Sequence, residues 1–268
     1  MNRLLGPALL FCPADRPERY EKARAAADAV ILDLEDAVAA DRKDLAREAV
    51  AASHEPAETT VVRINPIGAG MLEADLAAVD AGGYRVVMLA KTESVEQLAA
   101  LERYAVIALC ETPAGVLAAP ALAAAPNTAG LMWGAEDLVA ALGGRSSRRA
   151  DGGYRDVARA ARSAVLLAAG AAGVAAYDTV HLDFRDEAGL QAEAEDAAAV
   201  GFTGTVCIHP RQVPVVRAAY RPTDEELAWA QRVVEAAASG GVVAVDGRMI
   251  DEPLLRQARR TLAAAGPS

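Results

Sequence analysis

The sequence lacks a hydrophobic run long enough to cross a membrane. Its longest apolar run, Ala164–Ala176, has thirteen residues, whereas a membrane-spanning helix needs about 20. We therefore predict a packed helix at that position. The opening stretch MNRLLGPALLFC has one Arg and no small-residue cleavage site after it. We interpret it as a first strand rather than a signal peptide, and we expect no membrane contact.

Paired cysteines are also missing. Cys12, Cys110 and Cys207 each lie in or at the end of an apolar, strand-like run, and the chain has no C-x-x-C spacing. This pattern gives no support to a zinc or redox motif. It favours buried free thiols, which suit a reducing environment, and we expect the protein to be cytoplasmic.

Positive charge is in deficit, because the formal net charge is -10. A general nucleic-acid-binding protein needs a basic face that neutralises phosphates, so the composition argues against that class. Any ligand that carries phosphate must be bound by a local basic cluster instead.

Two basic segments could form such a cluster. The loop GGRSSRRADGGYR contains Arg145, Arg148 and Arg149; it could clamp an anionic ligand, or it could be a flexible surface loop. The segment DRPERYEKAR contains Arg16 and Lys22. Some of its cations must be ordinary solvated helix residues.

Short apolar runs alternate with longer Ala-rich segments of helical period along most of the chain. Continuous apolar runs are expected for parallel strands that are buried on both faces. The length of 268 residues is close to the ~250 residues typical of one (βα)₈ barrel. The predicted strands are Ala8–Cys12, Ala29–Leu34, Thr60–Ile64, Val86–Leu89, Val106–Cys110, Gly130–Trp133, Thr179–Leu182 and Thr205–Ile208.

Polar or ionisable residues stand at the carboxyl end of all eight runs, where the active sites of (βα)₈ barrels lie. An open doubly wound sheet is the alternative fold. Eight units, and the absence of G-x-G-x-x-G after the first strand, count against it. The terminal polar residues are Asp15 and Arg16; Asp33, Glu35 and Asp36; Arg63 and Asn65; Lys91; Glu111; Glu136 and Asp137; Asp183; and His209.

Two acids carry the main functional hypothesis. The strand VIALC ends at Glu111, and the next strand, GLMW, is followed by Glu136 and Asp137. Neighbouring parallel strands deliver such carboxylates to one rim, and Mg²⁺ is bound through one or two carboxylates plus substrate oxygens. We predict that Glu111 and Asp137 hold this ion. The alternative is that each acid only caps the helix that follows it.

The C-terminal segment reads as a separate addition. We predict a barrel over residues 1–222, followed over 223–268 by a closing helix and a lid segment. The closing helix, Thr223–Ser239, is capped by Thr223 or Asp224 and broken by Gly240-Gly241. A hairpin turning at Asp246-Gly247 and a last helix, Glu252–Ala265, complete the chain.

With these segments in place, the chain resembles the citrate lyase β-subunit-like proteins of the HpcH/HpaI aldolase superfamily. Any one matching motif would be weak evidence, but all of them occur in family order over the whole length. The motifs are FCPADRPERYEKA, VILDLEDAVAADRKDLAR, VVRINPIGAGMLEADL, MLAKTES, ALCETPAG, LMWGAEDL, GFTGTVCIHPRQV and DGRMIDEPLL. The chain departs from the family pattern at Ala14, where many relatives have Gly, and at Ala90, where they often have Pro.

The resemblance implies a (βα)₈ barrel, trimeric or hexameric, that acts on an acyl-CoA and a 2-oxo acid. It places the magnesium ligands on Glu111 and Asp137 and a substrate-binding arginine on Arg63. It also implies a strand-four lysine at Lys91, which we expect to bind substrate, and a lid aspartate at Asp251. In several members this lid reaches the site of a neighbouring subunit.

Further expectations concern residues around these groups. The acidic pair Glu35 and Asp36 is expected to orient Arg63 or metal-bound water, while Asp33 is a weaker candidate. Arg63 would stabilise an oxyanion, or it could form only a buried ion pair with Glu35 or Asp36. Asp251 would donate a proton to an enolate, or it could only cap the last helix; both roles are compatible.

The remaining candidates are cations and histidines. We expect the CoA phosphates to contact residues among Arg16, Lys22 and Arg149. His209 is interpreted as a structural rim residue, His181 as part of the seventh strand and His54 as exposed.

The predicted activity is Mg²⁺-dependent cleavage of a 3-hydroxyacyl-CoA, of the malyl-CoA or citramalyl-CoA type, into a 2-oxo acid and an acyl-CoA. Three alternatives stay open: a citrate lyase β subunit that acts on a carrier-bound thioester, an aldolase of 2-oxo acids that ignores CoA, and a CoA-binding scaffold without catalysis.

Overall fold

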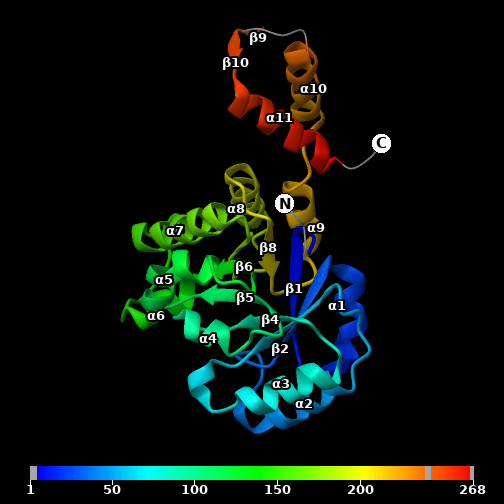
Figure 1. Cartoon of the computed structure of the whole chain (residues 1–268), viewed down its shortest axis with the longest axis vertical. Helices are drawn as coiled ribbons and strands as arrows, with labels where there is room; N and C mark the ends of the chain where they lie inside the picture. Colours follow the sequence, from blue (N-terminus) through cyan, green and yellow to red (C-terminus); the bar gives the residue numbers. More distant parts are fainter. Residues whose placement is uncertain (1–4, 239–242, 266–268) are drawn as a thin grey trace. The chain divides into compact units, whose positions relative to one another are not determined.

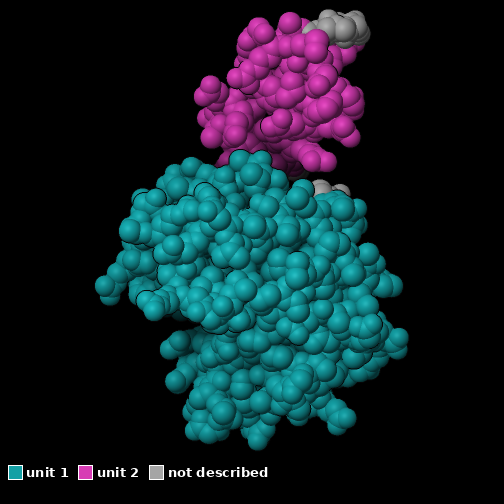
Figure 2. Space-filling view, turned by 90° about the vertical axis from the view of Figure 1, so that its left-hand side faces the viewer, with its two compact units in different colours: residues 1–216 teal, residues 217–268 magenta. Residues whose placement is uncertain are grey.

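The computed structural model describes residues 5–238 and 243–265. It divides into two compact units, residues 1–216 and 217–268, which Figure 2 shows in teal and magenta. Within the described ranges, no helix has both the length and the apolar character of a membrane span.

The first unit is a closed barrel of eight parallel strands (Figure 1). The strands pair in sequence order, and the barrel closes where β1 pairs with β8 through Ala8–Thr205, Leu9–Val206 and Leu10–Cys207. This confirms the predicted (βα)₈ fold. The strands are β1 Ala8–Pro13, β2 Ala29–Asp33, β3 Thr60–Ile64, β4 Val86–Leu89, β5 Ala105–Cys110, β6 Thr128–Trp133, β7 Ala175–Asp178 and β8 Gly204–Cys207.

Helices follow the strands and surround the barrel (Figure 1). Three short 3-10 turns, Pro17–Arg19, Ala40–Arg42 and Ile67–Ala69, precede the first three of them. The helices of the barrel segment are α1 Tyr20–Ala26, α2 Lys43–Ala51, α3 Leu72–Ala81, α4 Val95–Ala99, α5 Pro113–Ala123, α6 Ala135–Ala141, α7 Asp156–Ala172, α8 Glu187–Val200 and α9 Gln212–Ala219.

Alternation along each strand decides what fills the barrel. Side chains point to opposite faces at successive positions, so residues two apart share a face. Side chains from one face of the strands form a buried apolar cluster. Its members include Leu9, Ile31, Val61, Ile107 and Leu109. The residue two positions after the last core residue of such a strand lies on the same face, at the barrel mouth. The alternation therefore determines which side chains point into the mouth.

The seventh strand is where the sequence prediction was wrong. The strand is Ala175–Asp178 rather than Thr179–Leu182, and the helix predicted over Ala164–Ala176 ends at Ala172. Gly173 ends the helix with a left-handed conformation (φ 73°). Because Ala175 and Ala176 are weak strand formers, the Ala-rich run concealed the change from helix to strand.

The polar residue at the end of the seventh strand therefore differs from the predicted one. Asp178, not Asp183, ends β7; it is buried and accepts hydrogen bonds from Trp133 Nε1 (2.5 Å) and Arg162 Nη2 (2.8 Å). His181 lies after the strand, where its Nδ1 is 2.8 Å from Glu193 Oε2.

The second unit contains α10 Asp224–Ala238, the hairpin β9 Val243–Val245 and β10 Arg248–Ile250, and α11 Glu252–Ala264. Of the two predicted caps of α10, Thr223 or Asp224, it is Thr223 whose hydroxyl accepts from the backbone N–H of Glu226 (3.2 Å). The Asp246-Gly247 turn is confirmed, with φ of 52° and 76°. A small apolar core that includes Ala230, Val233 and Ala258 joins the two helices.

Helix α9, which follows β8 directly, was not predicted. The predicted break at Gly240-Gly241 lies outside the described residues. The boundary at residue 222, the closing role of α10 and the lid role of the segment stay predictions.

Candidate functional site

The inner faces of four strands, β1, β2, β3 and β5, meet at the barrel mouth. Asp33 follows Ile31 by two residues, Arg63 follows Val61, Glu111 follows Leu109, and Phe11 follows Leu9, and all four starting positions are core residues. The period of two therefore directs these side chains into the barrel. Asp33, Arg63 and Glu111 are buried, so their charges must be balanced by partners.

Asp33 is the main partner of Arg63. The two residues are register partners on β2 and β3, and Arg63 donates from Nε to Asp33 Oδ1 (2.6 Å) and from Nη2 to Oδ2 (2.5 Å). The guanidinium carbon also lies 4.5 Å from the centre of the Phe11 ring. A bidentate pair of this kind fixes the plane of the guanidinium group.

Glu35 links Arg63 to Lys91. Its Oε2 is 3.2 Å from Arg63 Nη1, and its Oε1 accepts a 2.5 Å hydrogen bond from Lys91 Nζ. Burial raises the pKa of Glu35, although both cations oppose that shift. Arg63 thus has the ion pair with Glu35 that the sequence left as an alternative, but its strongest pair is with Asp33, which the sequence analysis ranked lower.

Glu111 and Asp137 converge on Lys91. Lys91 Nζ lies 3.9 Å from Glu111 Oε1 and 3.6 Å from Asp137 Oδ1, and the Lys91 backbone N–H donates to Glu111 Oε1 (3.0 Å). The two acids therefore lie on the same side of the barrel, around one point. Their assignment as metal ligands stays a prediction.

Helix capping does not explain Glu111. The cap of α5 is Thr112, whose hydroxyl accepts from the Gly115 backbone N–H (3.0 Å). Asp137 lies in the first turn of α6, where Gly134 is the N-cap residue. The positive end of the helix dipole stabilises the Asp137 carboxylate. The same carboxylate also lies near Glu111, because both approach Lys91 Nζ.

The charges at this point suit a divalent cation. The cluster contains four acidic side chains, Asp33, Glu35, Glu111 and Asp137, and only two cationic ones, Arg63 and Lys91. Burial, and then repulsion by Asp137, raise the pKa of Glu111 to about 8. An added 2+ ion would balance the remaining charge, and hard carboxylate oxygens are the ligands that Mg²⁺ prefers.

Protein ligands alone would not enclose such an ion. Within residues 5–238 and 243–265, no three His, Cys, Asp or Glu side chains are grouped closely enough to hold a metal. Water or substrate oxygens would have to complete its coordination, as is usual for Mg²⁺.

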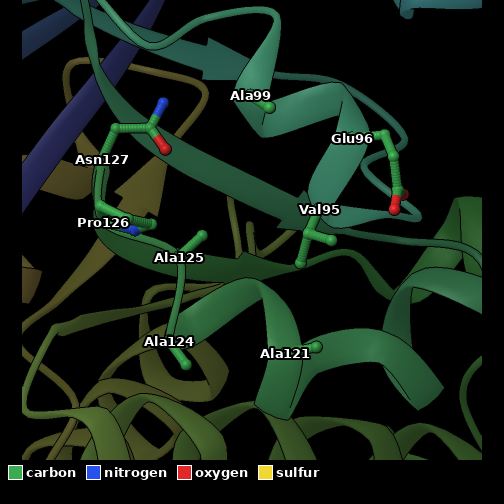
Figure 3. Close-up of a pocket in the computed structure, with 8 residues that line it drawn as sticks. All are labelled: Val95, Glu96, Ala99, Ala121, Ala124, Ala125, Pro126 and Asn127. Atoms are coloured by element: carbon green, nitrogen blue, oxygen red, sulfur yellow. The ribbon is translucent and has the colours of Figure 1, made fainter.

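A different cavity lies outside this cluster, between α4, α5 and the start of β6 (Figure 3). Its volume is about 400 Å³, and Val95, Ala121 and Pro126 are among the apolar residues that line it. The side-chain amide of Asn127 already donates to Leu98 O (2.9 Å) and Leu101 O (3.0 Å). None of the predicted site residues lines this groove, so it has no part in the candidate site.

Comparison with known proteins gives the family. The model of the family described as HpcH/HpaI aldolase/citrate lyase matches residues 8–210. The chain belongs to this family. It is 57% identical over 265 residues to the citrate lyase subunit beta-like protein of Mycobacterium tuberculosis, covering 98% of this chain and 97% of that protein.

Two further comparisons are informative. The crystal structure of CitE from Mycobacterium tuberculosis in complex with magnesium, acetoacetate and coenzyme A has a TM-score of 0.96 and 57% identity, and covers 99% of this chain and 100% of that chain. A (3S)-malyl-CoA thioesterase of Cereibacter sphaeroides is 36% identical over 275 residues, covering 96% of this chain and 94% of that protein.

Several predicted residues lie apart from the carboxylate cluster of this HpcH/HpaI family member. Asp36 is exposed, and it is its backbone N–H that contacts Glu35 Oε2 (3.0 Å). Arg16 is exposed beside Asp15 (3.9 Å), Lys22 is exposed on α1, and Arg149 pairs with Asp156 (2.9 Å). The structure does not bring these three cations together through any contact, and their role in CoA binding stays a prediction.

Asp251 belongs to the second unit. It is exposed and caps α11, because its side chain accepts from the Leu254 backbone N–H (3.2 Å). The capping interpretation is therefore confirmed. The catalytic one, which is compatible with it, stays a prediction.

The sequence analysis missed Lys43 and Asp75, which with Asn65 hold the loop after β2. Lys43 Nζ donates to Leu34 O (2.6 Å), Glu35 O (2.7 Å) and Asn65 Oδ1 (2.9 Å). Asn65 in turn donates from its backbone and its amide to Asp75, which is completely buried. Lys43 and its partner Asn65 thus fix the backbone at Leu34 and Glu35. The sequence offered one signal for these two residues, since Lys43 and Asp75 lie inside the motifs that carry the family resemblance.

Gly134 was also missed, although the cluster depends on it. A Cβ atom at this position would lie 2.7 Å from Glu111 Cβ and 3.0 Å from Glu111 Oε2. Only a residue without a side chain lets the end of β6 approach the Glu111 carboxylate this closely.

We therefore predict that Gly134→Ala displaces Glu111 and weakens Mg²⁺ binding by about tenfold or more, which corresponds to roughly 1.4 kcal/mol. Isothermal titration calorimetry with Mg²⁺ would measure this. Gly170→Ala on α7 is the matched control, because nothing lies within 4 Å of the added Cβ. Equal affinities for both variants would mean that Glu111 does not depend on Gly134.

Proposed function

We propose that this protein is a Mg²⁺-dependent carbon–carbon lyase that cleaves a 3-hydroxyacyl-CoA of the malyl-CoA or citramalyl-CoA type into a 2-oxo acid and an acyl-CoA. The observation that carries the proposal is the convergence of Glu111, Asp137 and Glu35 around one point next to the Arg63 guanidinium. Membership of the family supports lyase chemistry. The complex of CitE with magnesium, acetoacetate and coenzyme A supports this choice of cofactor and substrate class.

The metal would be held by Glu111 and Asp137. When bound, magnesium would act as a Lewis acid toward a substrate oxygen and as a template for the substrate carboxylate. The four acids against two cations support a third positive group at this position. The pKa of Glu111, raised first by burial and then by repulsion from Asp137, supports it as well, because a bound cation would stabilise the ionised carboxylate.

Arg63 would stabilise the oxygen at which charge develops. In the cleavage, the bond between C2 and C3 breaks, its electron pair remains on the thioester half as an enolate, and the 3-hydroxyl loses its proton to become a carbonyl. A guanidinium that Asp33 already holds in one plane needs little reorganisation to bind this oxygen. Glu35 supports the same orientation from the other edge.

The enolate must then accept a proton at C2. We assign this step to Asp251, which would have to approach the barrel mouth of its own or a neighbouring chain. In line with this, we propose a trimer or hexamer in which the segment after residue 222 serves as a lid. Lys91 would bind an anionic group of the substrate, and Arg16, Lys22 and Arg149 would contact the phosphates of CoA. A cytoplasmic location completes the proposal.

One relative favours a second function. Hydrolysis of the thioester is the reaction that the name of the (3S)-malyl-CoA thioesterase states. Such an enzyme would release free CoA and a hydroxy acid without breaking the carbon–carbon bond.

One assay separates these functions. Purified protein with Mg²⁺ and malyl-CoA or citramalyl-CoA is expected to release a 2-oxo acid, detected with phenylhydrazine, without a matching rise in free thiol. Free thiol without oxo acid would indicate the thioesterase. Cleavage only of a carrier-bound thioester would indicate a citrate lyase β subunit, and cleavage of a free hydroxy-oxo acid a CoA-independent aldolase. No turnover with any substrate would leave a scaffold.

Arg63→Lys should lower kcat by about a hundredfold or more while KM changes little, because a loss confined to the transition state appears in kcat. The variant keeps the charge but loses the bidentate pair with Asp33. Arg103→Lys is the matched control, since Arg103 forms an exposed pair with Asp80 (3.1 Å). Unchanged turnover in Arg63→Lys would remove Arg63 from the mechanism.

Asp251→Asn separates the two roles of Asp251. Asn caps helices about as well as Asp, so the thermal stability should be kept while kcat falls. Asp251→Ala should lose the same activity and in addition about 1 kcal/mol of stability. If Asp251→Asn turned over normally, the cap would be the only function of this residue.

A further inference from the structure

Lys91 has an unusual backbone conformation. Its φ of 50° is one of two positive values at non-glycine positions among the described residues, and a left-handed conformation is unfavourable for a lysine. It lets the backbone N–H reach Glu111 Oε1 (3.0 Å) while the side chain turns toward Glu35 (2.5 Å). The backbone N–H and the side-chain ammonium group of Lys91 thus both face the carboxylate cluster.

The Lys91 ammonium group occupies the centre of the carboxylate cluster. Besides Glu35, it lies 3.6 Å from Asp137 Oδ1 and 3.9 Å from Glu111 Oε1. An ion bound by these two acids would sit about 2.0–2.1 Å from their oxygens. It would therefore compete with the ammonium for the same oxygens, and the two like charges would repel each other strongly at so short a separation.

We propose that Lys91 is a displaceable counter-ion: it holds Glu111 and Asp137 together before the metal binds, and the divalent cation binds by driving its ammonium group away from these two acids. This inference rests on the proposed function, because it takes these acids as the metal ligands. The Lys91 and Asp137 side chains are 32% and 39% exposed, so both the exit of the amine and the entry of the ion are open to solvent.

Glu35 determines where the displaced group goes. It keeps the shortest contact with Lys91 Nζ (2.5 Å) and is not one of the two proposed ligands. The flexible lysine stem can turn about this contact toward the mouth. Metal binding thereby presents a positive amine to an anionic substrate, so that the metal binds first and the substrate second.

The composition makes this movement measurable. The chain has only three lysines, Lys22, Lys43 and Lys91. Lys22 is exposed, and Lys43 Nζ is bonded to three oxygens away from the proposed ligands. Lys22 can therefore serve as an internal reference, and Lys43 as an amine that the metal should not release.

The first test is trace amine acylation of the wild-type chain, read by mass spectrometry. Adding Mg²⁺ should raise the labelling of Lys91 relative to Lys22 by about threefold or more, because the amine leaves two of its three carboxylates. NaCl at the same ionic strength should not produce this change, and Lys43 should not respond. A Lys91 to Lys22 ratio that is unchanged at saturating Mg²⁺ would overturn the inference.

The second test is Mg²⁺ binding by calorimetry without substrate. Lys91→Met, which removes the competing charge, should bind Mg²⁺ about tenfold more tightly than the wild type. Lys91→Arg keeps the charge and should bind it no more tightly. Lys91→Met should also have a lower Tm without metal, since the carboxylates then repel one another.

The outcomes distinguish the two hypotheses. If the wild type binds Mg²⁺ and Lys91→Met binds it no more tightly, the counter-ion inference fails and the metal site stands. If Glu111→Gln binds Mg²⁺ as well as the wild type, or if none of the chains binds it, the proposed metal site fails and the inference fails with it.

Discussion

The pair between Asp33 and Arg63 is the interaction on which the barrel mouth depends. Burying an unpaired guanidinium costs several kilocalories per mole, and Arg63 is only 8% exposed. Asp33 meets it from the adjacent strand at the same register position, so the backbone itself sets the geometry. With Nε and Nη2 engaged, Nη1 is directed to Glu35, and Glu35 in turn holds Lys91.

Two features of the backbone bring the residues of the carboxylate cluster together. Gly134 lets β6 approach Glu111, and the left-handed conformation of Lys91 turns its N–H toward the same carboxylate. Both depart from what local preferences would select, and such departures are expected to concentrate at functional sites. Crowding four carboxylates in one mouth is unfavourable by itself. The arrangement is explained if it exists to bind cations and anionic ligands.

The sequence predicted most of the fold because buried parallel strands read as apolar runs that end in polar residues. It failed at β7, where Ala175 and Ala176 continue the composition of α7 and only Gly173 marks the change. For the site, the strand-end position was enough to select Arg63, Glu111 and Asp137. Asp33 could have been ranked first by counting two residues from Ile31. The position of the Lys91 amine could not be predicted. It depends on the positive φ of Lys91 and on acids that follow β2, β5 and β6, which lie far apart in the sequence.

The residues on either side of Lys91, Ala90 and Thr92, hold its conformation in place. Ala90 is completely buried, and its N–H donates a long hydrogen bond to Ile64 O (3.4 Å), which a proline could not form. On the other side, Thr92 donates from its backbone to Leu109 O (3.0 Å) and from its hydroxyl to Leu89 O (2.7 Å). Lys91 is thus fixed between two residues bonded to neighbouring strands. These bonds on both sides fix the strained backbone of Lys91 and thereby the direction of its N–H and its side chain.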